Sequence, residues 1–212
     1  MPRFETVAAT EAYRERCEDR VAVFADEDRT VVVVADGAGG TGSGDIAAQM
    51  VIREIQNAYP HIHSATQWEQ LLRQVDCRIT PGESTAVVVD LRPYGMAGAS
   101  VGDSQAWSIA DGVVDELTLH QHRKPLLGSG NANPTCFLRA PLAGTLLVAT
   151  DGLFDYAKRA KLTAKIATSE FSTIPRVCIE LVRLPSGELW DDIGVIAVRN
   201  AIHRRPRRRY VI

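Results

Sequence analysis

The sequence predicts an α+β protein in which two stacked antiparallel β-sheets each carry a pair of helices on the outer face. Strand-like and helix-like segments come in separate runs along the 212 residues, in the order strands, two helices, strands, two helices, strand. Segregated runs of this kind favour layered α+β architectures over an alternating parallel sheet. Each predicted helix has one apolar stripe, and this arrangement would bury every stripe.

The first half of the chain begins with a predicted hairpin and continues into two amphipathic helices. Residues 21–24 and 30–35 are strand-like and flank an acidic turn. The glycine-rich segment 39–44 follows, and we expect it to form a flexible turn. Ser64, with Gln67 three residues later, is a capping box that opens the second helix. The apolar positions of the two helices recur at helical spacing: Ile46, Ala47, Met50, Val51 and Ile55, then Trp68, Leu71, Leu72, Val75 and Ile79.

The second half is predicted to hold the remaining strands. Residues 85–119 have the pattern of a meander of three or four strands, with turns at 92–95 and 111–112. Residues 120–144 are rich in Gly, Pro and Asn, so we expect them to form the least regular part of the chain.

The remaining elements form a strand, a helical pair and a last strand. A strand is expected at 146–150, and helices follow near 156–167 and 174–184. Pro175 stands in the first turn of the second of these helices, where its missing N–H costs nothing. A strand at 193–198 closes the fold.

Length and composition favour one globular domain, which we assign to residues 1–200, followed by a basic tail at 201–212. No apolar run approaches the roughly 20 residues that span a bilayer, and no secretory signal pattern opens the chain. The four cysteines are far apart and form no CxxC pair, so we expect free thiols in the cytoplasm. The formal net charge of −2 gives no reason to expect nucleic-acid binding, and we expect a monomer with a solvated tail.

Acidic residues stand where several predicted strands end or begin. Asp36 and Asp151 each open an Asp-Gly pair after an apolar run, Asp103 follows residues 97–102, and Asp191 precedes the last strand. Carboxylates that converge on one point repel one another unless a cation lies between them. The pattern therefore predicts a site for a hard cation such as Mg²⁺ or Mn²⁺, built from carboxylates and backbone carbonyls.

Six segments, taken together, carry a resemblance to a known family. They are RERCED at 14–19, ADGAGG at 35–40, STA at 84–86, VGDS at 101–104, TDGLFD at 150–155 and DDIGV at 191–195. In this order they resemble the metal-dependent serine/threonine protein phosphatases of the PPM type (type 2C), in their compact bacterial form. A lone DGxGG would be weak evidence, but the six segments span nearly the whole chain.

The resemblance implies two metal ions and a ligand set for each. Asp36 would bridge the two ions, and Asp151 and Asp191 would complete the first. The backbone carbonyl of Gly37 would bind the second ion, with Glu18 contributing directly or through water. Two such ions activate a water and hold it in line with phosphorus.

Four further residues receive supporting roles from the resemblance. Asp19 would lie behind the ligands and support them, while Asp103 and Asp155 would hold a third, weaker ion. Arg14 would clamp the substrate phosphate, because a guanidinium donates two parallel hydrogen bonds to it.

Two of these assignments have a structural alternative. Asp155 could instead cap the helix that follows it. Arg14 could instead form a surface ion pair with Glu11 or Glu15.

The implied activity is hydrolysis of phosphoserine and phosphothreonine in proteins by a hydroxide that bridges the metal ions, without a phosphoenzyme. The partners would be phosphorylated proteins and a cognate serine/threonine kinase that the enzyme opposes. Two rivals stay open: a dedicated regulator phosphatase of the sigma-regulator type, and a non-catalytic module that binds phosphoproteins. The presence of Asp36, Asp151 and Asp191 together disfavours the second rival.

The chain departs from the family pattern at two places. Ala38 stands where many eukaryotic members have a histidine that protonates the leaving group, so water or another histidine would serve; compact bacterial members manage without it. About 46 residues separate Ser104 from Asp151. This spacing leaves little or no room for a flap subdomain, and residues 127–134 would be its shortened remnant.

Overall fold

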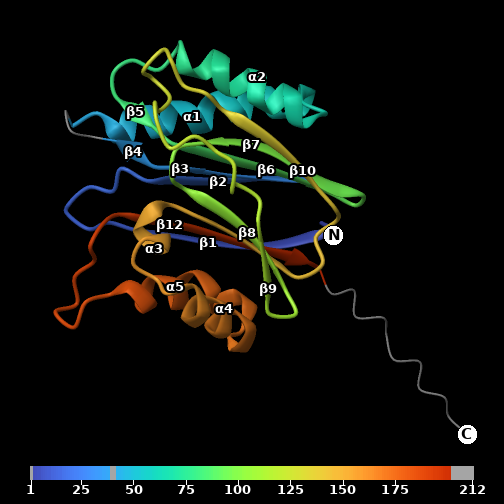
Figure 1. Ribbon diagram of the computed structural model, residues 1–212, viewed down its shortest axis with the longest axis vertical. Helices are drawn as coiled ribbons and strands as arrows, with labels where there is room; N and C mark the ends of the chain where they lie inside the picture. The colour runs from blue at the N-terminus through green and yellow to red at the C-terminus, as the bar shows by residue number, and fades with distance from the viewer. Residues whose placement is uncertain (1, 39–41, 202–212) are drawn as a thin grey trace, which may run out of the picture.

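The computed structural model describes residues 2–38 and 42–201, and these form a β-sandwich with helices on both outer faces (Figure 1). The glycines at 39–40 and the basic tail from 202 onward lie outside the described residues. The two large sheets are stacked between α1 and α2 on one side and α4 and α5 on the other (Figure 1). The predicted α+β layers are therefore confirmed.

The sheet next to α1 and α2, which we call sheet B, has the strand order β10-β7-β6-β3-β2, and every neighbouring pair is antiparallel. A separate short pair, β4 (Gly37–Ala38) and β5 (Glu83–Ser84), lies beyond the ends of β3 and β6 and contacts α1. The bounds of the five strands are β2 (Arg20–Ala25), β3 (Thr30–Ala35), β6 (Ala86–Arg92), β7 (Gly95–Val101) and β10 (Thr135–Arg139).

The other sheet, sheet A, has the order β1-β12-β11-β8-β9 and is also antiparallel. Its strands come from both ends and the middle of the chain, so the terminal strands β1 and β12 lie side by side. The bounds are β1 (Phe4–Glu11), β8 (Gln105–Ala110), β9 (Val113–Glu116), β11 (Thr145–Ala149) and β12 (Ile193–Asn200).

The helices form the two outer layers. Over sheet B, α1 (Gly44–Ala58) and α2 (Ala65–Asp76) are joined by a short 3₁₀ turn, η1 (Tyr59–His61). Over sheet A, α3 (Asp151–Phe154) and α4 (Arg159–Thr168) are followed by η2 (Phe171–Thr173) and α5 (Ile174–Val182). Among the described helices, none is long and apolar enough to cross a membrane.

The central strands are apolar on both faces because both faces are covered. Val31 and Val33 of β3 pack against the helices over sheet B, whereas Val32 and Val34 pack against sheet A. All four are completely buried. Three apolar layers therefore fix the central strands, and a strand that is fixed along its length holds the residue at its end in one place.

Two strands differ from the prediction. The sequence prediction missed β1 and β10, both of which lie at a sheet edge. An edge strand is only partly covered, so polar residues interrupt its apolar pattern: β1 has Glu5 and Glu11, and β10 has Arg139.

Three predicted elements also need correction. The meander predicted at 85–119 is divided: β6 and β7 belong to sheet B, whereas β8 and β9 belong to sheet A. The helix predicted near 156–167 is α4 and begins later, at Arg159, while the short helix α3 at Asp151–Phe154 precedes it and was not predicted. The second helix ends at Asp76, so Ile79, which the sequence analysis counted among its apolar positions, lies beyond its end.

The cap of α2 is confirmed with one change in its partners. The Ser64 hydroxyl accepts a hydrogen bond from the Gln67 backbone N–H, as the capping box predicts. The Gln67 side chain reaches back one residue further than expected and accepts from the His63 N–H at 2.8 Å.

The irregular segment 126–132 is bound to the end of α2. The carboxylate of Asp76 accepts hydrogen bonds from the backbone N–H groups of Gly128, Gly130 and Ala132 at 2.8, 3.0 and 2.9 Å. Leu127 is completely buried and exchanges two backbone hydrogen bonds with Ser84. The segment is therefore a strap between the end of α2 and β5.

Replacing Asp76 by alanine should destabilise the protein strongly, because it leaves three backbone N–H groups without an acceptor. We expect the free energy of unfolding in urea to fall by about 3 kcal/mol. Asp115→Ala is the matched control, since Asp115 forms only a surface ion pair with Arg139, and it should cost less than about 1 kcal/mol. Equal losses in the two variants would contradict the role of the strap.

Candidate metal centre

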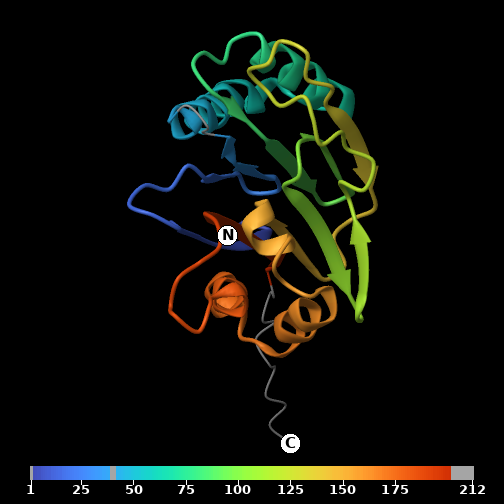
Figure 2. The ribbon, with the colours of Figure 1, turned by 60° about the vertical axis from the view of Figure 1, so that its left-hand side comes forward.

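Three carboxylates converge at one edge of the sandwich. Asp36, Asp103 and Asp151 each offer one oxygen, and these oxygens all lie within 4.8 Å of one another. Asp36 directly follows β3 and Asp103 follows β7, both in sheet B, while Asp151 follows β11 in sheet A. The centre thus lies where the ends of the two sheets meet, beside α3, which begins at Asp151 (Figure 2).

The crossing of the chain from sheet B to sheet A brings Asp103 to this edge. Gly102 makes the turn at φ +104°, and a side chain there would also meet Thr85 at 2.6 Å. β3 and β7 run in the same direction on either side of β6, so Asp36 and Asp103 come to the same edge of sheet B. The division of the meander between the two sheets, which the sequence did not reveal, makes Asp103 part of the crossing to sheet A.

Burial and like charge act together on these groups. Burial raises the pKa of Asp36 to about 10, and the charges of Asp19, Asp151 and Asp103 add to the rise. Burial also raises the pKa of Asp151 to about 6, with further contributions from Asp103 and Asp191. Groups in this arrangement ionise together only when cations compensate them, and oxygen donors of this kind suit Mg²⁺ or Mn²⁺.

Asp19 lies beneath the centre. Only 2% of its surface is exposed, and its Oδ2 has no hydrogen-bond partner within the described residues. Burial raises its pKa to about 7, and the charges of Asp192, Asp151 and Asp191 raise it further. A buried carboxylate oxygen without a donor is costly. A cation with its water shell at the centre would supply that donor, so the residues present fit a metal.

Glu18 and Gly37 are brought to the same point, at the start of α1. A Cβ added to Gly44 would lie 2.5 Å from the Gly37 carbonyl oxygen and 2.7 Å from Glu18 Oε2. Both oxygens therefore face Gly44, and only glycine leaves room for them there. The glycine at this position serves a close approach of the backbone, whereas the sequence suggested only a flexible turn.

The backbone of Asp36 is fixed by hydroxyl groups of the neighbouring strand. Its N–H donates to Thr85 Oγ1 at 3.0 Å, and its carbonyl accepts from the Thr85 N–H at 2.8 Å and from Ser84 Oγ at 3.0 Å. Thr85 Oγ1 also lies 2.8 Å from the hydroxyl of Ser104, the residue after Asp103. The segment 84–86 thus joins two of the three converging acids, a role that its sequence alone did not indicate.

Asp191 and Asp192 lie at the rim of the centre, where Asp191 faces the other acids and Asp192 binds backbone N–H groups. Partial burial among the other acids raises the pKa of Asp191, but its carboxylate lies outside the group of three. Asp192 accepts from the backbone N–H of Tyr13 at 2.7 Å and of Glu18 at 2.5 Å, so it holds the loop between β1 and β2 in place. The sequence analysis missed this role, for which the doubled aspartate was the only signal.

Arg14 is exposed at the rim and lines a cleft of about 360 Å³ with Glu18, Trp190 and Asp191. Its guanidinium lies 5.0 Å from the centre of the Tyr13 ring.

The surface ion pair considered for Arg14 does not form with Glu11, because that carboxylate pairs with Arg183 at 2.6 Å. Nor does Arg14 pair with Glu15 in the described structure. The Arg14 guanidinium therefore has no ion-pair partner among the described residues.

Only one of the two acids assigned to a third ion belongs to the group of three. Asp103 belongs to the group of three and lies 3.6 Å from Arg123. Asp155 is exposed and ends α3, and its N–H donates to the carbonyl of Asp151. The alternative cap is wrong, since Lys158 and not Asp155 precedes α4.

Comparison with known proteins finds similar chains among bacterial phosphatases. No family model matches the chain. The serine/threonine phosphatase stp of Listeria innocua is 26% identical over 153 residues, which cover 63% of this chain and 61% of the Listeria protein. The chain therefore spans about three fifths of the length of the curated relatives it matches.

Solved structures agree more completely in fold. The serine/threonine phosphatase of S. agalactiae superposes with a TM-score of 0.80 at 17% identity, over 93% of this chain and 100% of that one. The catalytic domain of the phosphatase PstP, in complex with two manganese ions, superposes with a TM-score of 0.76 at 18% identity, over 92% and 97%. The chain thus has the fold of the bacterial serine/threonine phosphatases, and the resemblance seen in the sequence is confirmed.

A methyl group at position 44 should weaken metal binding specifically. In Gly44→Ala the new Cβ would displace the Gly37 carbonyl and the Glu18 carboxylate, so we expect manganese affinity measured by calorimetry to fall at least about tenfold. Ser43→Ala is the control, because the Ser43 side chain makes no capping hydrogen bond. Unchanged affinity in a folded Gly44→Ala protein would contradict this geometry.

Stability should depend on pH and metal together. The unfolded chain loses these aspartate protons near pH 3.8, whereas the folded pKa values of Asp151, Asp19 and Asp36 are about 6, 7 and 10. The stability that these groups contribute without metal is therefore complete below about pH 4 and is lost as pH rises through the folded values.

Manganese replaces these protons, so its stabilising effect should grow over the same range. We expect the rise in Tm on replacing EDTA by manganese to be larger at about pH 8 than at about pH 5. Asp36→Asn should reduce this difference, since it removes the group with the highest pKa. An equal rise at both pH values would contradict the assignment.

Proposed function

We propose that this protein hydrolyses phosphoserine and phosphothreonine in proteins with two Mn²⁺ or Mg²⁺ ions bound at the acidic centre. The observation that carries the proposal is the convergence of Asp36, Asp103 and Asp151 from three strand ends. The fold of the bacterial serine/threonine phosphatases and the sequence similarity to the Listeria protein support it.

In this proposal Asp36 would be shared by the two ions, Asp151 and Asp191 would hold the first with it, and the Gly37 carbonyl and Glu18 would hold the second. Asp103 and Asp155 would hold a third ion, and of these two acids Asp103 is the one that lies beside Asp36 and Asp151. When bound, such ions lower the pKa of a water and compensate the charge that spreads over the phosphoryl oxygens.

The chain's own residues supply binding and orientation around that chemistry. Arg14 binds two phosphate oxygens with its planar fork, and the Tyr13 ring beneath the guanidinium holds it over the cleft. Arg16 is paired with Asp45, so it leaves the phosphate mainly to Arg14. Ala38 has no proton to give, so water protonates the leaving alkoxide, and the enzyme should favour good leaving groups.

The biological setting is part of the proposal. The substrates are phosphoproteins, the enzyme opposes a serine/threonine kinase, and it acts as a cytoplasmic monomer through the domain 1–200. Turnover of generic phosphopeptides would separate this general phosphatase from one dedicated to a single regulator.

The test is hydrolysis of a phosphothreonine peptide with manganese and with EDTA. We expect turnover only with manganese, and a loss of at least about a hundredfold in Asp36→Asn and in Asp151→Asn, because each change removes a ligand. Asp111→Asn, in the exposed turn between β8 and β9, is the control and should keep full activity. No turnover by the folded, manganese-loaded protein would overturn the general phosphatase.

A further inference from the structure

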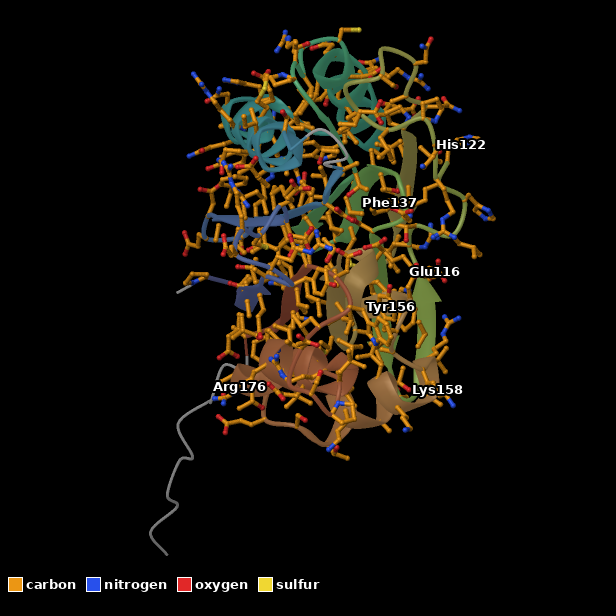
Figure 3. The ribbon with its side chains drawn as sticks, turned by 90° about the vertical axis from the view of Figure 1, so that its left-hand side faces the viewer. Glu116, His122, Phe137, Tyr156, Lys158 and Arg176 are labelled. Carbon is orange, nitrogen blue, oxygen red and sulfur yellow. The ribbon has the colours of Figure 1, made fainter. Side chains whose placement is uncertain are left out.

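Two aromatic rings are stacked on the surface beside the acidic centre. The rings of Tyr156 and Trp190 lie 5.6 Å apart and within 7° of parallel. They come from separate segments, one after α3 and the other just before β12. Tyr156 is labelled in Figure 3, on the face where the ends of the two sheets meet.

Core packing does not account for this pair. Trp190 is 53% exposed and Tyr156 is 45% exposed, whereas the other two tryptophans, Trp68 and Trp107, are 0% and 5% exposed. Neither ring belongs to the described hydrophobic clusters. Half-exposed Trp and Tyr side chains that are already held rigid by stacking are the residues that most often anchor a binding partner.

The pair adjoins the cleft in which phosphate binding is proposed. Trp190 lines this cleft together with Arg14 and Asp191, and Tyr13 forms another part of its wall. The cleft therefore has a charged part and an aromatic part. A phosphate group uses only the charged part, so the aromatic part suits whatever the phosphate is attached to.

The charges around the rings favour an apolar occupant. Arg16 is paired with Asp45, and Arg14 is occupied by the phosphate in the proposed function. The charges of Asp191, Asp151 and Asp155 act on the Tyr156 hydroxyl. The proposed function assigns all three of these acids to metal ions, which would compensate their charges. Little uncompensated charge then faces the rings, and ring faces gain most from burying apolar surface.

We propose that Trp190 and Tyr156 form a docking platform for the peptide on one side of the phosphorylated residue, and that the platform selects an apolar side chain there. The inference rests on the proposed function, because the phosphate position fixes the peptide in the cleft. A side chain one or two residues from the phosphorylated residue lies within about 7 Å along an extended chain, so it reaches the rim.

The test compares two phosphothreonine peptides that differ only in the residues within two positions of the phosphothreonine, which are leucine in one and glycine in the other. With manganese, the protein should hydrolyse the leucine peptide with a kcat/KM about fivefold higher. In Trp190→Ala and in Tyr156→Ala, the ratio of the two kcat/KM values should fall most of the way to one, because the leucine peptide loses more than the glycine peptide. Trp190→Phe should keep much of it.

Tyr94→Ala is the matched control. Tyr94 is 75% exposed in the turn between β6 and β7, at the opposite end of β6 from Thr85, so its loss should leave the preference intact. Equal losses for both peptides in Trp190→Ala would mean that Trp190 only supports Asp191. That result, or the absence of a leucine preference, would overturn the platform.

Binding without turnover separates this inference from the proposed function. Peptides with a non-hydrolysable phosphonate should quench tryptophan fluorescence, because Trp190 is the exposed tryptophan. The leucine analogue should bind about fivefold more tightly than the glycine analogue. Selective binding without hydrolysis would overturn the phosphatase activity and keep the platform. Hydrolysis without selectivity would overturn the platform and keep the activity. The absence of both selectivity and hydrolysis would overturn both proposals.

Discussion

Carboxylates held close together at one edge of the sandwich repel one another, and the strands that carry them must resist this repulsion. Asp36, Asp103 and Asp151 approach one another within 4.8 Å, and Asp19 lies buried beneath them with one oxygen unpartnered. Burial and the neighbouring charges raise the pKa of Asp36, Asp151 and Asp19 and so favour the protonated form of these three groups. The fold holds the acids together against that preference, and divalent cations at this edge would compensate their charge.

The sandwich is suited to this task because its central strands cannot shift. β3 is buried on both faces, and β11 packs in the same way between sheet B and the helices over sheet A. Residues that directly follow such strands inherit their rigidity. Hydroxyl groups of Ser84, Thr85 and Ser104 then fix the backbone at the strand ends. These groups are neutral, so they position the aspartates without adding charge to the site.

The features that the sequence did not reveal depend on exposure at sheet edges or on contacts between distant residues. β1 and β10 are edge strands, whose exposed faces accept polar residues and so lose the apolar pattern. Asp192 acts through two backbone N–H groups more than 170 residues away, and no local pattern records such a contact. The need for glycine at position 44 arises from the approach of Gly37 and Glu18, which only folding brings there.

Hydrophobic periodicity and turn chemistry are local properties of the chain, so the layers, the apolar cores and the positions of the acids at strand ends can be predicted from the sequence. The resemblance carried by its six motifs added the site residues as predictions. The folded structure alone shows which acids lie together, since their distances depend on how two sheets stack and where the chain crosses between them. It alone also placed Trp190 against Tyr156, two residues that are 34 positions apart.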